Sequence, residues 1–290
     1  MARIAVTGGS GKLGRAVVAD LLGAGYDVVN LDRAPPPAPS AAPFVRVELT
    51  DAGQALEALT AVDDRYTGVD GLVHLAAVPG PGVTTNAATF AHNATATYNV
   101  FSAARAAGIR NVVWASSETL LGLPFERPPA YVPVDEEAEV RPETSYSLAK
   151  AVEEEMARHF CRWDPELTMT GLRFSNVMEP ADYAAFPAYD ADPAGRAWNL
   201  WGYIDARDGA QAVRLSLERP GPGLELLIIA NADTVLQTDS ADVVARHLPG
   251  VEVRGTLTGR QTLLSIDRAR RVLGYEPRHS WRDEQQRPNG

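Results

Sequence analysis

The stretch TGGSGKLG at residues 7–14 decides the fold that this sequence predicts. It follows a short apolar segment, 3–7, and opens a segment of helical spacing, 12–24. Glycines at such a turn allow a tight bend, and they let the backbone approach a pyrophosphate bound at the N-terminus of the helix. The order strand, glycine turn and helix therefore predicts a dinucleotide site. Its expected cofactor-binding residues are Gly8, Gly11, Lys12, Leu13 and Gly14.

Asp32 indicates which dinucleotide binds. It lies 18 residues after Gly14, at the end of the segment 27–31, close to the usual place of the acidic residue in such sites. A carboxylate there accepts hydrogen bonds from both hydroxyls of the adenosine ribose and repels a 2′-phosphate. The prediction is therefore NAD rather than NADP. Arg33 keeps NADP open, because an arginine at this place can accommodate a 2′-phosphate.

Short apolar runs alternate with helical patterns through the first two thirds of the chain. Such alternation predicts right-handed crossovers and an α/β fold with a Rossmann-like, doubly wound parallel sheet. Further strands are expected at 44–49, 71–76, 111–116, 167–174 and 224–230, and helices at 52–62, 86–107, 146–163 and 207–217. We expect a cofactor domain at 1–176 and 204–232, a small substrate-binding lobe at 177–203 and 233–285, and a tail at 286–290.

Composition excludes several classes of protein. The net charge of −10 argues against nucleic acid and membrane surfaces as partners, since both require a cationic face. A single cysteine, Cys161, excludes an internal disulfide and thiolate zinc clusters, and the scattered histidines lack ligand spacing, so no metal is expected. No apolar run approaches the ~18 residues of a membrane span, and the first residues lack a signal-peptide pattern. A cytoplasmic protein is expected.

Lysine is scarce, which makes each retained lysine informative. Of the 27 basic residues only Lys12 and Lys150 are lysine. Lys12 is expected on an exposed turn, where a lysine can occur by chance and needs no functional explanation. Lys150 follows Tyr146 by four positions, so both share one helix face and the ammonium can lower the pKa of the phenol toward neutral pH. The pair predicts a general acid and base, whereas a solvated helix face is the plainer alternative.

Two serines end the predicted strand 111–116, at the edge where α/β sheets carry ligand groups. A hydroxyl at Ser116 or Ser117 can hydrogen-bond a substrate oxygen. Together these segments resemble the extended short-chain dehydrogenase/reductase superfamily, of the NAD-dependent epimerase/dehydratase type, over residues 1–280. The segments that carry the resemblance are TGGSGKLG at 7–14, LD at 31–32, HLAA at 74–77, WASSETLLG at 114–122, YSLAK at 146–150, LRFSNVMEP at 172–180, YIDARD at 203–208 and LGYEP at 273–277.

The resemblance implies roles for individual residues. Ser117, five residues before Gly122, is implied as catalytic with Tyr146 and Lys150. The cofactor is implied to contact Glu48 and Leu49 at the adenine, Leu75, Ala76 and Ala77 beside it, and Phe174 and Ser175 at the nicotinamide, with Asn93 supporting the backbone and Tyr146 and Lys150 also in contact. The expected substrate-binding residues are Val78, Glu118, Asn176 and Trp201. A homodimer is implied through helices 86–107 and 144–162.

Departures from the family pattern separate three hypotheses. Trp201 stands where nucleotide-sugar enzymes have a diphosphate-binding arginine, and only one acid, Glu118, follows Ser117, which argues against dehydration. Asn176, in contrast, matches an asparagine that epimerases use near the sugar phosphate. The leading hypothesis is an NAD-dependent oxidoreductase acting on a secondary alcohol of a sugar, sugar acid or polyol. The alternatives are a nucleotide-sugar 4-epimerase and a non-catalytic, NAD-binding regulatory protein.

Overall fold

The computed structural model describes residues 1–62, 65–125 and 127–286, so the tail expected at 286–290 lies outside the described residues past Gln286. A parallel sheet of seven strands forms its centre, in the order β12-β9-β7-β6-β1-β2-β3. Those strands are β12 (Gly223–Ile229), β9 (Thr168–Phe174), β7 (Asn111–Ser117), β6 (Gly71–His74), β1 (Arg3–Thr7), β2 (Asp27–Asp32) and β3 (Phe44–Arg46). The predicted Rossmann-like fold is confirmed.

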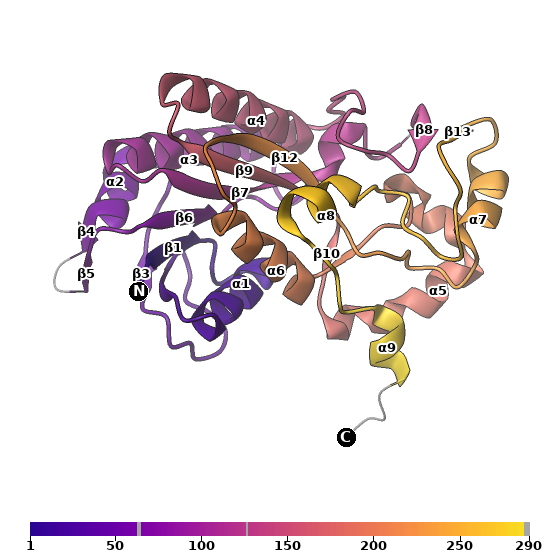
Figure 1. Ribbon diagram of the computed structural model, residues 1–290, viewed down its shortest axis with the longest axis horizontal. Helices are drawn as coiled ribbons and strands as arrows, with labels where there is room; N and C mark the ends of the chain where they lie inside the picture. Colours follow the sequence, from indigo (N-terminus) through magenta and orange to yellow (C-terminus); the bar gives the residue numbers. More distant parts are fainter. Residues whose placement is uncertain (63–64, 126, 287–290) are drawn as a thin grey trace.

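Helices cover both faces of this sheet (Figure 1). On one face α2 (Ala52–Thr60), α3 (Asn86–Ala106) and α4 (Ser145–Trp163) lie side by side, and on the other α1 (Lys12–Gly23) packs against α6 (Ala206–Leu217). The first layer buries an edge-to-face cluster of Phe101, Trp114 and Phe160. Burial on both faces explains why the central strands read as continuous apolar runs rather than as alternating patterns.

Three predicted elements end earlier than expected. The strand expected at 44–49 stops at Arg46, and the strand expected at 71–76 stops at His74. The helix expected at 52–62 stops at Thr60, because the next residues form β4 (Ala61–Val62), which pairs antiparallel with β5 (Tyr66–Thr67). Its start is as predicted, since the Asp51 side chain accepts a hydrogen bond from the backbone N–H of Gln54 at 3.0 Å.

The region without a clear sequence period folds as short helical turns. Residues after β10 (Val177–Met178) form the turns η2 (Pro180–Ala185) and η3 (Pro193–Asn199), with α5 (Phe186–Ala191) between them, before β11 (Ile204–Asp205) pairs with β10. Aromatic packing replaces helical periodicity here: Phe186 contacts Tyr183, Tyr203 and Trp281 edge to face. This packing belongs to the same apolar core that fills the α1–α6 face of the sheet.

The C-terminal part of the described chain adds three short helices and a strand that pairs with an earlier segment. Helices α7 (Ser240–His247) and α8 (Asp267–Leu273) precede a last helix, α9 (Trp281–Gln286). The proline-rich segment 122–144 contains β8 (Tyr131–Val132), which pairs with β13 (Glu252–Val253). None of the helices in the described part of the chain is long and apolar enough to cross a membrane.

Candidate active site

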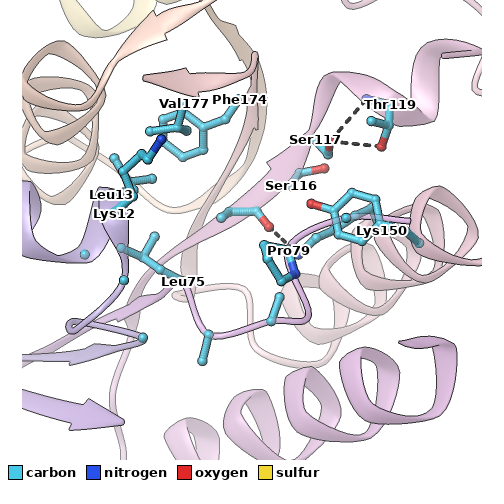
Figure 2. A pocket seen from close by; sticks show the side chains of 18 of the residues that line it. Lys12, Leu13, Leu75, Pro79, Ser116, Ser117, Thr119, Lys150, Phe174 and Val177 are labelled. Carbon is cyan, nitrogen blue, oxygen red and sulfur yellow. Dashed lines mark hydrogen bonds between the residues drawn. The ribbon is translucent and has the colours of Figure 1, made fainter. Parts of the chain in front are cut away.

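A cavity of about 950 Å³ opens at the carboxyl ends of β1, β2, β6, β7 and β9. Open α/β sheets bind ligands at this edge, because the loops that follow parallel strands converge there. Figure 2 shows the start of α1, with Lys12 and Leu13, on one side of the cavity, and Ser117, Thr119 and Lys150 on the other. The site therefore joins the glycine turn to the predicted catalytic residues.

Two glycines of the turn are required by its geometry. Gly8 has φ +71°, and a Cβ there would lie 2.6 Å from the backbone nitrogen of Ala76. At Gly14 a Cβ would lie 2.1 Å from the carbonyl oxygen of Gly8. The N-cap residue Gly11 offers no side-chain hydrogen bond, and the first turn of α1 holds no acidic residue. The first N–H groups of α1 are thus available to an anion such as a pyrophosphate.

Asp32 is held rigidly at the end of β2. Its carboxylate accepts hydrogen bonds from the backbone N–H groups of Ser10 at 3.0 Å and Arg33 at 2.6 Å. Each carboxylate oxygen retains lone pairs, so the group can still accept from a ribose that enters the cavity. Both Asp32 and Arg33 line the cavity.

We expect NAD to bind at least tenfold more tightly than NADP. A 2′-phosphate beside Asp32 would be repelled by on the order of 1–4 kcal/mol, depending on screening. Asp32→Asn should therefore narrow the gap, mainly by improving NADP binding. Calorimetric titration of both proteins with both cofactors measures this. Equal or tighter binding of NADP by the unaltered protein would contradict the expectation and implicate Arg33.

The two serines at the end of β7 have different hydrogen-bond partners. Ser116 donates its hydroxyl to the buried carboxylate of Glu154 at 2.7 Å, so its side chain is committed to the protein interior. The Ser117 hydroxyl accepts from the backbone N–H of Thr119 at 3.2 Å and from its hydroxyl at 2.9 Å, and it keeps its own proton to donate. Both serines line the cavity, so what favours Ser117 as the candidate catalytic serine is that the Ser116 hydroxyl is already used by Glu154.

Tyr146 and Lys150 lie on the first turns of α4, which begins with a capping box between Thr144 and Ser147. The Lys150 ammonium lies 5.9 Å from the centre of the Tyr146 ring, as the spacing of four residues predicts. It donates to the Ala115 carbonyl at 2.7 Å and to the Glu153 carboxylate at 2.9 Å. Ser117, Tyr146 and Lys150 thus meet at one wall of the cavity.

The electrostatic expectation for Tyr146 needs a correction. Burial raises the pKa of Tyr146, the Lys150 charge lowers it and Glu153 raises it again, so that the pKa lies above the usual value. Lys150 therefore acts in the predicted direction but is outweighed. Glu153 was missed from the sequence, although its place three residues after Lys150 puts both on the same helix face.

Glu118 sits beside Ser117 and is fully buried. Burial raises its pKa to about 7, although hydrogen bonds from Ser175 and Asn199 and the nearby charge of Arg196 lower it. The Asn199 amide donates to this carboxylate at 3.3 Å. The cavity therefore holds a carboxyl group that is largely protonated in mildly acidic solution.

Glu118 should make the stability of the protein depend on pH. The folded protein keeps this proton up to about pH 7, whereas an unfolded chain loses it near the ordinary glutamate pKa of 4.5. The contribution of Glu118 to the free energy of unfolding is therefore fully present below the pKa of the unfolded state, and it is lost as pH rises toward the pKa of the folded state. The total loss is about 3 kcal/mol relative to the Glu118→Gln protein. Urea unfolding of both proteins at pH 4.5 and 8 measures the difference. Parallel pH profiles would contradict it.

Most of the predicted cofactor contacts line the cavity: Gly8, Gly11, Lys12, Leu13, Gly14, Asp32, Arg33, Glu48, Leu49, Leu75, Ala76, Ala77, Tyr146, Lys150, Phe174 and Ser175. Of the expected substrate residues, Glu118 and Asn176 line it. Asn93 lies behind the wall, where its amide accepts from the Val78 N–H at 2.8 Å and donates to the Val78 carbonyl at 3.1 Å. It supports the backbone there, as the resemblance implies.

Trp201 and Val78, which were expected to bind the substrate, are not among the residues that line the cavity. Trp201 is fully buried, donates its indole N–H to the Pro193 carbonyl at 2.7 Å and packs on His247. The turn η3 instead brings Trp198 to the cavity. Beyond Val78 the loop residues Pro79, Gly80 and Pro81 line the cavity, together with His92 of α3, which the sequence did not single out.

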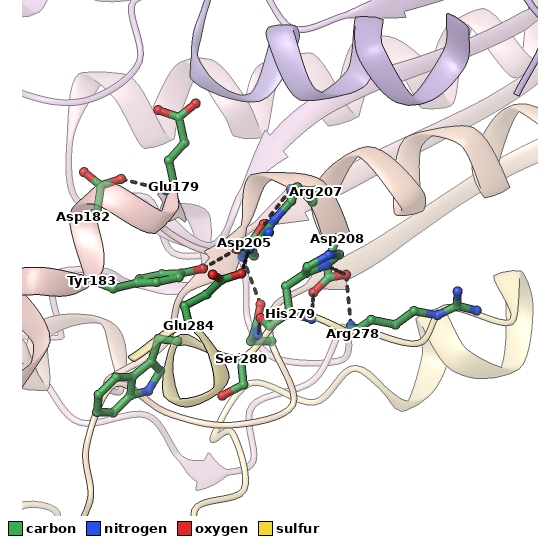
Figure 3. Close-up of polar contacts among 12 residues, drawn as sticks. Glu179, Asp182, Tyr183, Asp205, Arg207, Asp208, Arg278, His279, Ser280 and Glu284 are labelled. Carbon is green, nitrogen blue, oxygen red and sulfur yellow. Dashed lines mark hydrogen bonds and ion pairs between the residues drawn. The ribbon is translucent and has the colours of Figure 1, made fainter. Parts of the chain in front are cut away.

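Lys12 is not the isolated surface lysine that was expected. Its ammonium pairs with Asp182 of η2 at 2.6 Å, and Arg15 pairs with Glu179 at 2.7 Å. Figure 3 shows how this segment is anchored: Tyr183, beside Asp182, hydrogen-bonds the buried Asp205. The glycine turn is thus tied by ion pairs to the segment that follows β10.

The same figure shows the C-terminal segment fixed to α6. Arg207 bridges Asp205 at 2.8 Å and Glu284 at 2.7 Å, and Asp208 accepts from the backbone N–H groups of Arg278 at 2.9 Å and His279 at 2.8 Å. These carboxylates have structural partners and lie apart from the cavity lining. No group of three or more His, Cys, Asp or Glu among the described residues could hold a metal ion.

Comparison with known proteins gives one family and a consistent fold. A model described as the NAD dependent epimerase/dehydratase family matches residues 4–225. UDP-glucose 4-epimerase of Mus musculus is 29% identical over 220 residues, which cover 70% of this chain and 61% of that protein. The chain thus spans about three fifths of the length of this curated relative.

Two solved structures share the fold across most of the chain. One is a UDP-galactose 4-epimerase, with a TM-score of 0.69 and 24% identity, covering 97% of this chain and 95% of that one. The other is a mutated uronate dehydrogenase, with a TM-score of 0.69 and 22% identity, covering 100% of this chain and 89% of that one. Identities this low establish a shared architecture and leave the substrate open.

Proposed function

The chain belongs to the NAD-dependent epimerase/dehydratase family, and from this premise we propose that it oxidises a secondary alcohol of a small sugar, sugar acid or polyol. The chain is an enzyme of the extended short-chain dehydrogenase/reductase superfamily, whose cofactor here is NAD. When bound, NAD supplies the nicotinamide that accepts hydride. The residues that do the remaining work, and the substrate, are the subject of the proposal.

The cavity divides the work between its two ends. The glycine turn, with free N–H groups at the start of α1, would hold the pyrophosphate, and Asp32 would hold the ribose. Ser117 would donate a hydrogen bond to the substrate oxygen. As the phenolate, stabilised by Lys150, Tyr146 would take up the hydroxyl proton during oxidation, and as the phenol it would give that proton back during reduction. Carboxyl Glu118 would contact a neighbouring hydroxyl.

The observation that carries the choice of substrate is the position of the cations in the cavity. Among the described lining residues, Lys12, Arg33, His92 and Lys150 are basic, and they border the cofactor positions. The described lining residues that are left for the substrate hold no cation, and apart from Glu118 they are uncharged: Thr119, Leu123, Pro124, Thr144, Asn176, Val177 and Trp198 are among them. A diphosphate needs charge-assisted partners, so a small substrate without phosphate suits these residues best.

Arg196 of η3 does not supply that charge, because it lies behind the cavity wall. It is buried, donates to the Gly202 carbonyl at 2.9 Å, and stacks against Trp198 at 5.1 Å and Tyr189 at 5.2 Å. Burial lowers its pKa, although Tyr189 and Glu118 raise it. It thus supports the Trp198 ring rather than facing a ligand. The same argument favours neutral sugars and polyols over sugar acids.

A nucleotide-sugar 4-epimerase is the second candidate. Asn176 lines the cavity next to Ser175, and the curated relative with 29% identity is a UDP-glucose 4-epimerase. An epimerase would use the same three catalytic side chains, with the hydride returned to the opposite face of the intermediate. The hypothesis of a non-catalytic regulatory protein is less well supported, because the matching family is one of enzymes.

One assay separates these activities. The purified protein is incubated with NAD and a panel of aldoses, polyols, uronates and UDP-sugars, while absorbance at the NADH band and product identity are both followed. Net NADH with a neutral sugar or polyol supports the proposal. Isomerised UDP-sugar without net NADH supports the epimerase and rejects the oxidoreductase, and the Tyr146→Phe protein serves as the blank.

A cytoplasmic location stays a prediction.

We also propose a homodimer built on α3 and α4. Tyr98 of α3 and Leu148 of α4 are large apolar side chains that remain 53% and 45% exposed. We expect light scattering to give twice the chain mass of 31.1 kDa. The Leu148→Asp protein should shift toward the monomer, because a charge would be desolvated in the interface. A monomer at micromolar concentration would contradict the proposal.

The division into a cofactor domain and a small lobe is likewise proposed, with one change suggested by strand pairing. The segment around β8 pairs with β13, so part of 122–144 accompanies the lobe rather than the sheet. The lobe shares its apolar core with the α1–α6 layer, and Tyr183, Tyr203 and Trp281 all belong to that core. We therefore propose a lobe that does not fold independently of the sheet.

A further inference from the structure

Glu153 is a fully buried carboxylate on the same helix face as the catalytic pair. It accepts a hydrogen bond from the Lys150 ammonium at 2.9 Å, and Lys150 is itself only 4% exposed. Taking two charges out of water is costly, and a well-packed apolar pair is often as stable. Stability alone therefore gives little reason for a carboxylate at this place.

The other titratable groups near Lys150 do not neutralise its charge, so Glu153 is its direct counter-charge. Glu154, the next residue, is committed to Arg173 of β9 through two hydrogen bonds of 2.9 Å. His74 of β6 lies between the hydroxyls of Thr7 at 2.7 Å and Thr97 at 3.1 Å. Burial, and then Lys150 and His92, lower the pKa of His74 to about 3, so its ring is neutral at ordinary pH.

The remaining charged group that faces Tyr146 is Glu118 of η1 (Glu118–Leu121), which raises the pKa of the phenol only as far as it is ionised. Among the described residues, Glu153 is thus the carboxylate that contacts Lys150 directly. Burial raises the pKa of Glu153, although Lys150 and the Thr97 hydroxyl of α3 lower it, and the net pKa lies above its usual value. The ion pair is enclosed between α3, α4 and β7.

We propose that Glu153 is a positioning residue: it fixes the Lys150 ammonium at the cavity wall and offsets part of the ammonium charge that acts on Tyr146. The proposal rests on the catalytic roles proposed for Tyr146 and Lys150. Of the three N–H groups of the ammonium, one goes to Ala115 and one to Glu153, which leaves one for the cavity. Glu153 therefore decides in which direction the free N–H points.

The charges act in one consistent direction. Burial lowers the pKa of Lys150, whereas Glu153 and Tyr146 raise it. The raising effects are the larger, so the net pKa lies above its usual value. The same negative charge opposes ionisation of Tyr146. Removing the charge at Glu153 should therefore lower the pKa of Lys150 and that of Tyr146 together, since an ammonium loses stabilisation and a phenolate loses repulsion.

The scarcity of lysine makes this measurable. Lysine labelled with ¹³C at Cε gives two NMR signals, from Lys12 and Lys150, which Lys12→Arg assigns. We expect Lys150 in the unaltered protein to titrate above the usual lysine range. In Glu153→Gln it should titrate at least about one pH unit lower, a tenfold change in ionisation constant, which is the usual size of one close counter-charge. ¹³Cζ-labelled tyrosine, assigned with Tyr146→Phe, should show a parallel fall.

Two variants separate charge from folding. Glu155→Gln removes a charge two residues on along α4, where the side chain is 62% exposed, and should leave both titrations within a few tenths of a unit. Glu153→Asp keeps the charge and should retain most of the raised Lys150 value. An unchanged Lys150 midpoint in Glu153→Gln would overturn the proposal. If that variant does not fold, a wild-type midpoint at or below the usual range overturns it equally.

The titrations use neither substrate nor cofactor, so their outcome is independent of turnover. A protein that oxidises no sugar yet shows both shifts loses the proposed function and keeps the role of Glu153 in fixing the two ionisations. Conversely, sugar oxidation by a Glu153→Gln protein with an unshifted pH–rate profile and unshifted titrations keeps the function and removes Glu153 from it.

Discussion

Replacing Lys150 by arginine should lower turnover at least about a hundredfold while the protein still folds, because general acid–base catalysis contributes on that scale. The ammonium is enclosed, with the Ala115 carbonyl at 2.7 Å and Glu153 at 2.9 Å. A planar, larger guanidinium keeps the charge, but it cannot reproduce these contacts and also direct an N–H into the cavity. The measurement is the steady-state rate with whichever alcohol the substrate panel identifies, alongside thermal melting.

Matched variants bracket this result. Tyr146→Phe should lose a similar factor and still bind NAD, since it removes the proton-transferring hydroxyl and little else. Arg162→Lys makes the reverse exchange on an exposed position of the same helix and should leave the rate unchanged. A Lys150→Arg protein with unaltered rates would show that Lys150 is a structural charge and that the catalytic assignment is wrong.

Gly14→Ala should reduce NAD affinity by at least about a hundredfold, close to 3 kcal/mol, which is the size of a severe packing clash. A Cβ at this position would meet the Gly8 carbonyl oxygen at 2.1 Å and the Gly9 Cα at 2.6 Å. These are backbone atoms of the turn itself, so no side-chain rotation relieves the overlap. The turn or α1 must shift, and the N–H groups that would hold the pyrophosphate shift with it. Fluorescence titration with NADH measures the affinity.

Gly23→Ala is the control for the same helix. A Cβ at Gly23 meets nothing within 4 Å, and alanine is the better helix former there by roughly 0.5–1 kcal/mol. This variant should bind NADH like the unaltered protein and melt at an equal or higher temperature. If Gly14→Ala also binds normally, the turn is not where the cofactor's phosphates lie.

The central sheet was predictable because its determinants are local. Buried parallel strands are short apolar runs, and most of them are separated from the next strand by a helix. The glycine turn carries its own signal and appears where predicted, and the helix expected from residue 52 begins there, capped by Asp51. The segment 181–201 gave no such signal, because it is held by aromatic contacts of Phe186 with Tyr203 and Trp281, which are distant in the chain.

The sequence alone determined the fold, the family and the Tyr146–Lys150 pair, since a spacing of four residues on a helix brings two side chains together whatever surrounds them. Only the tertiary structure decided what surrounds them. Burial and Glu153 reverse the expected net shift of the Tyr146 pKa, and the turn η3 presents Trp198 to the cavity in place of Trp201. Desolvation and loop direction depend on packing between segments far apart in the chain, which no local spacing encodes.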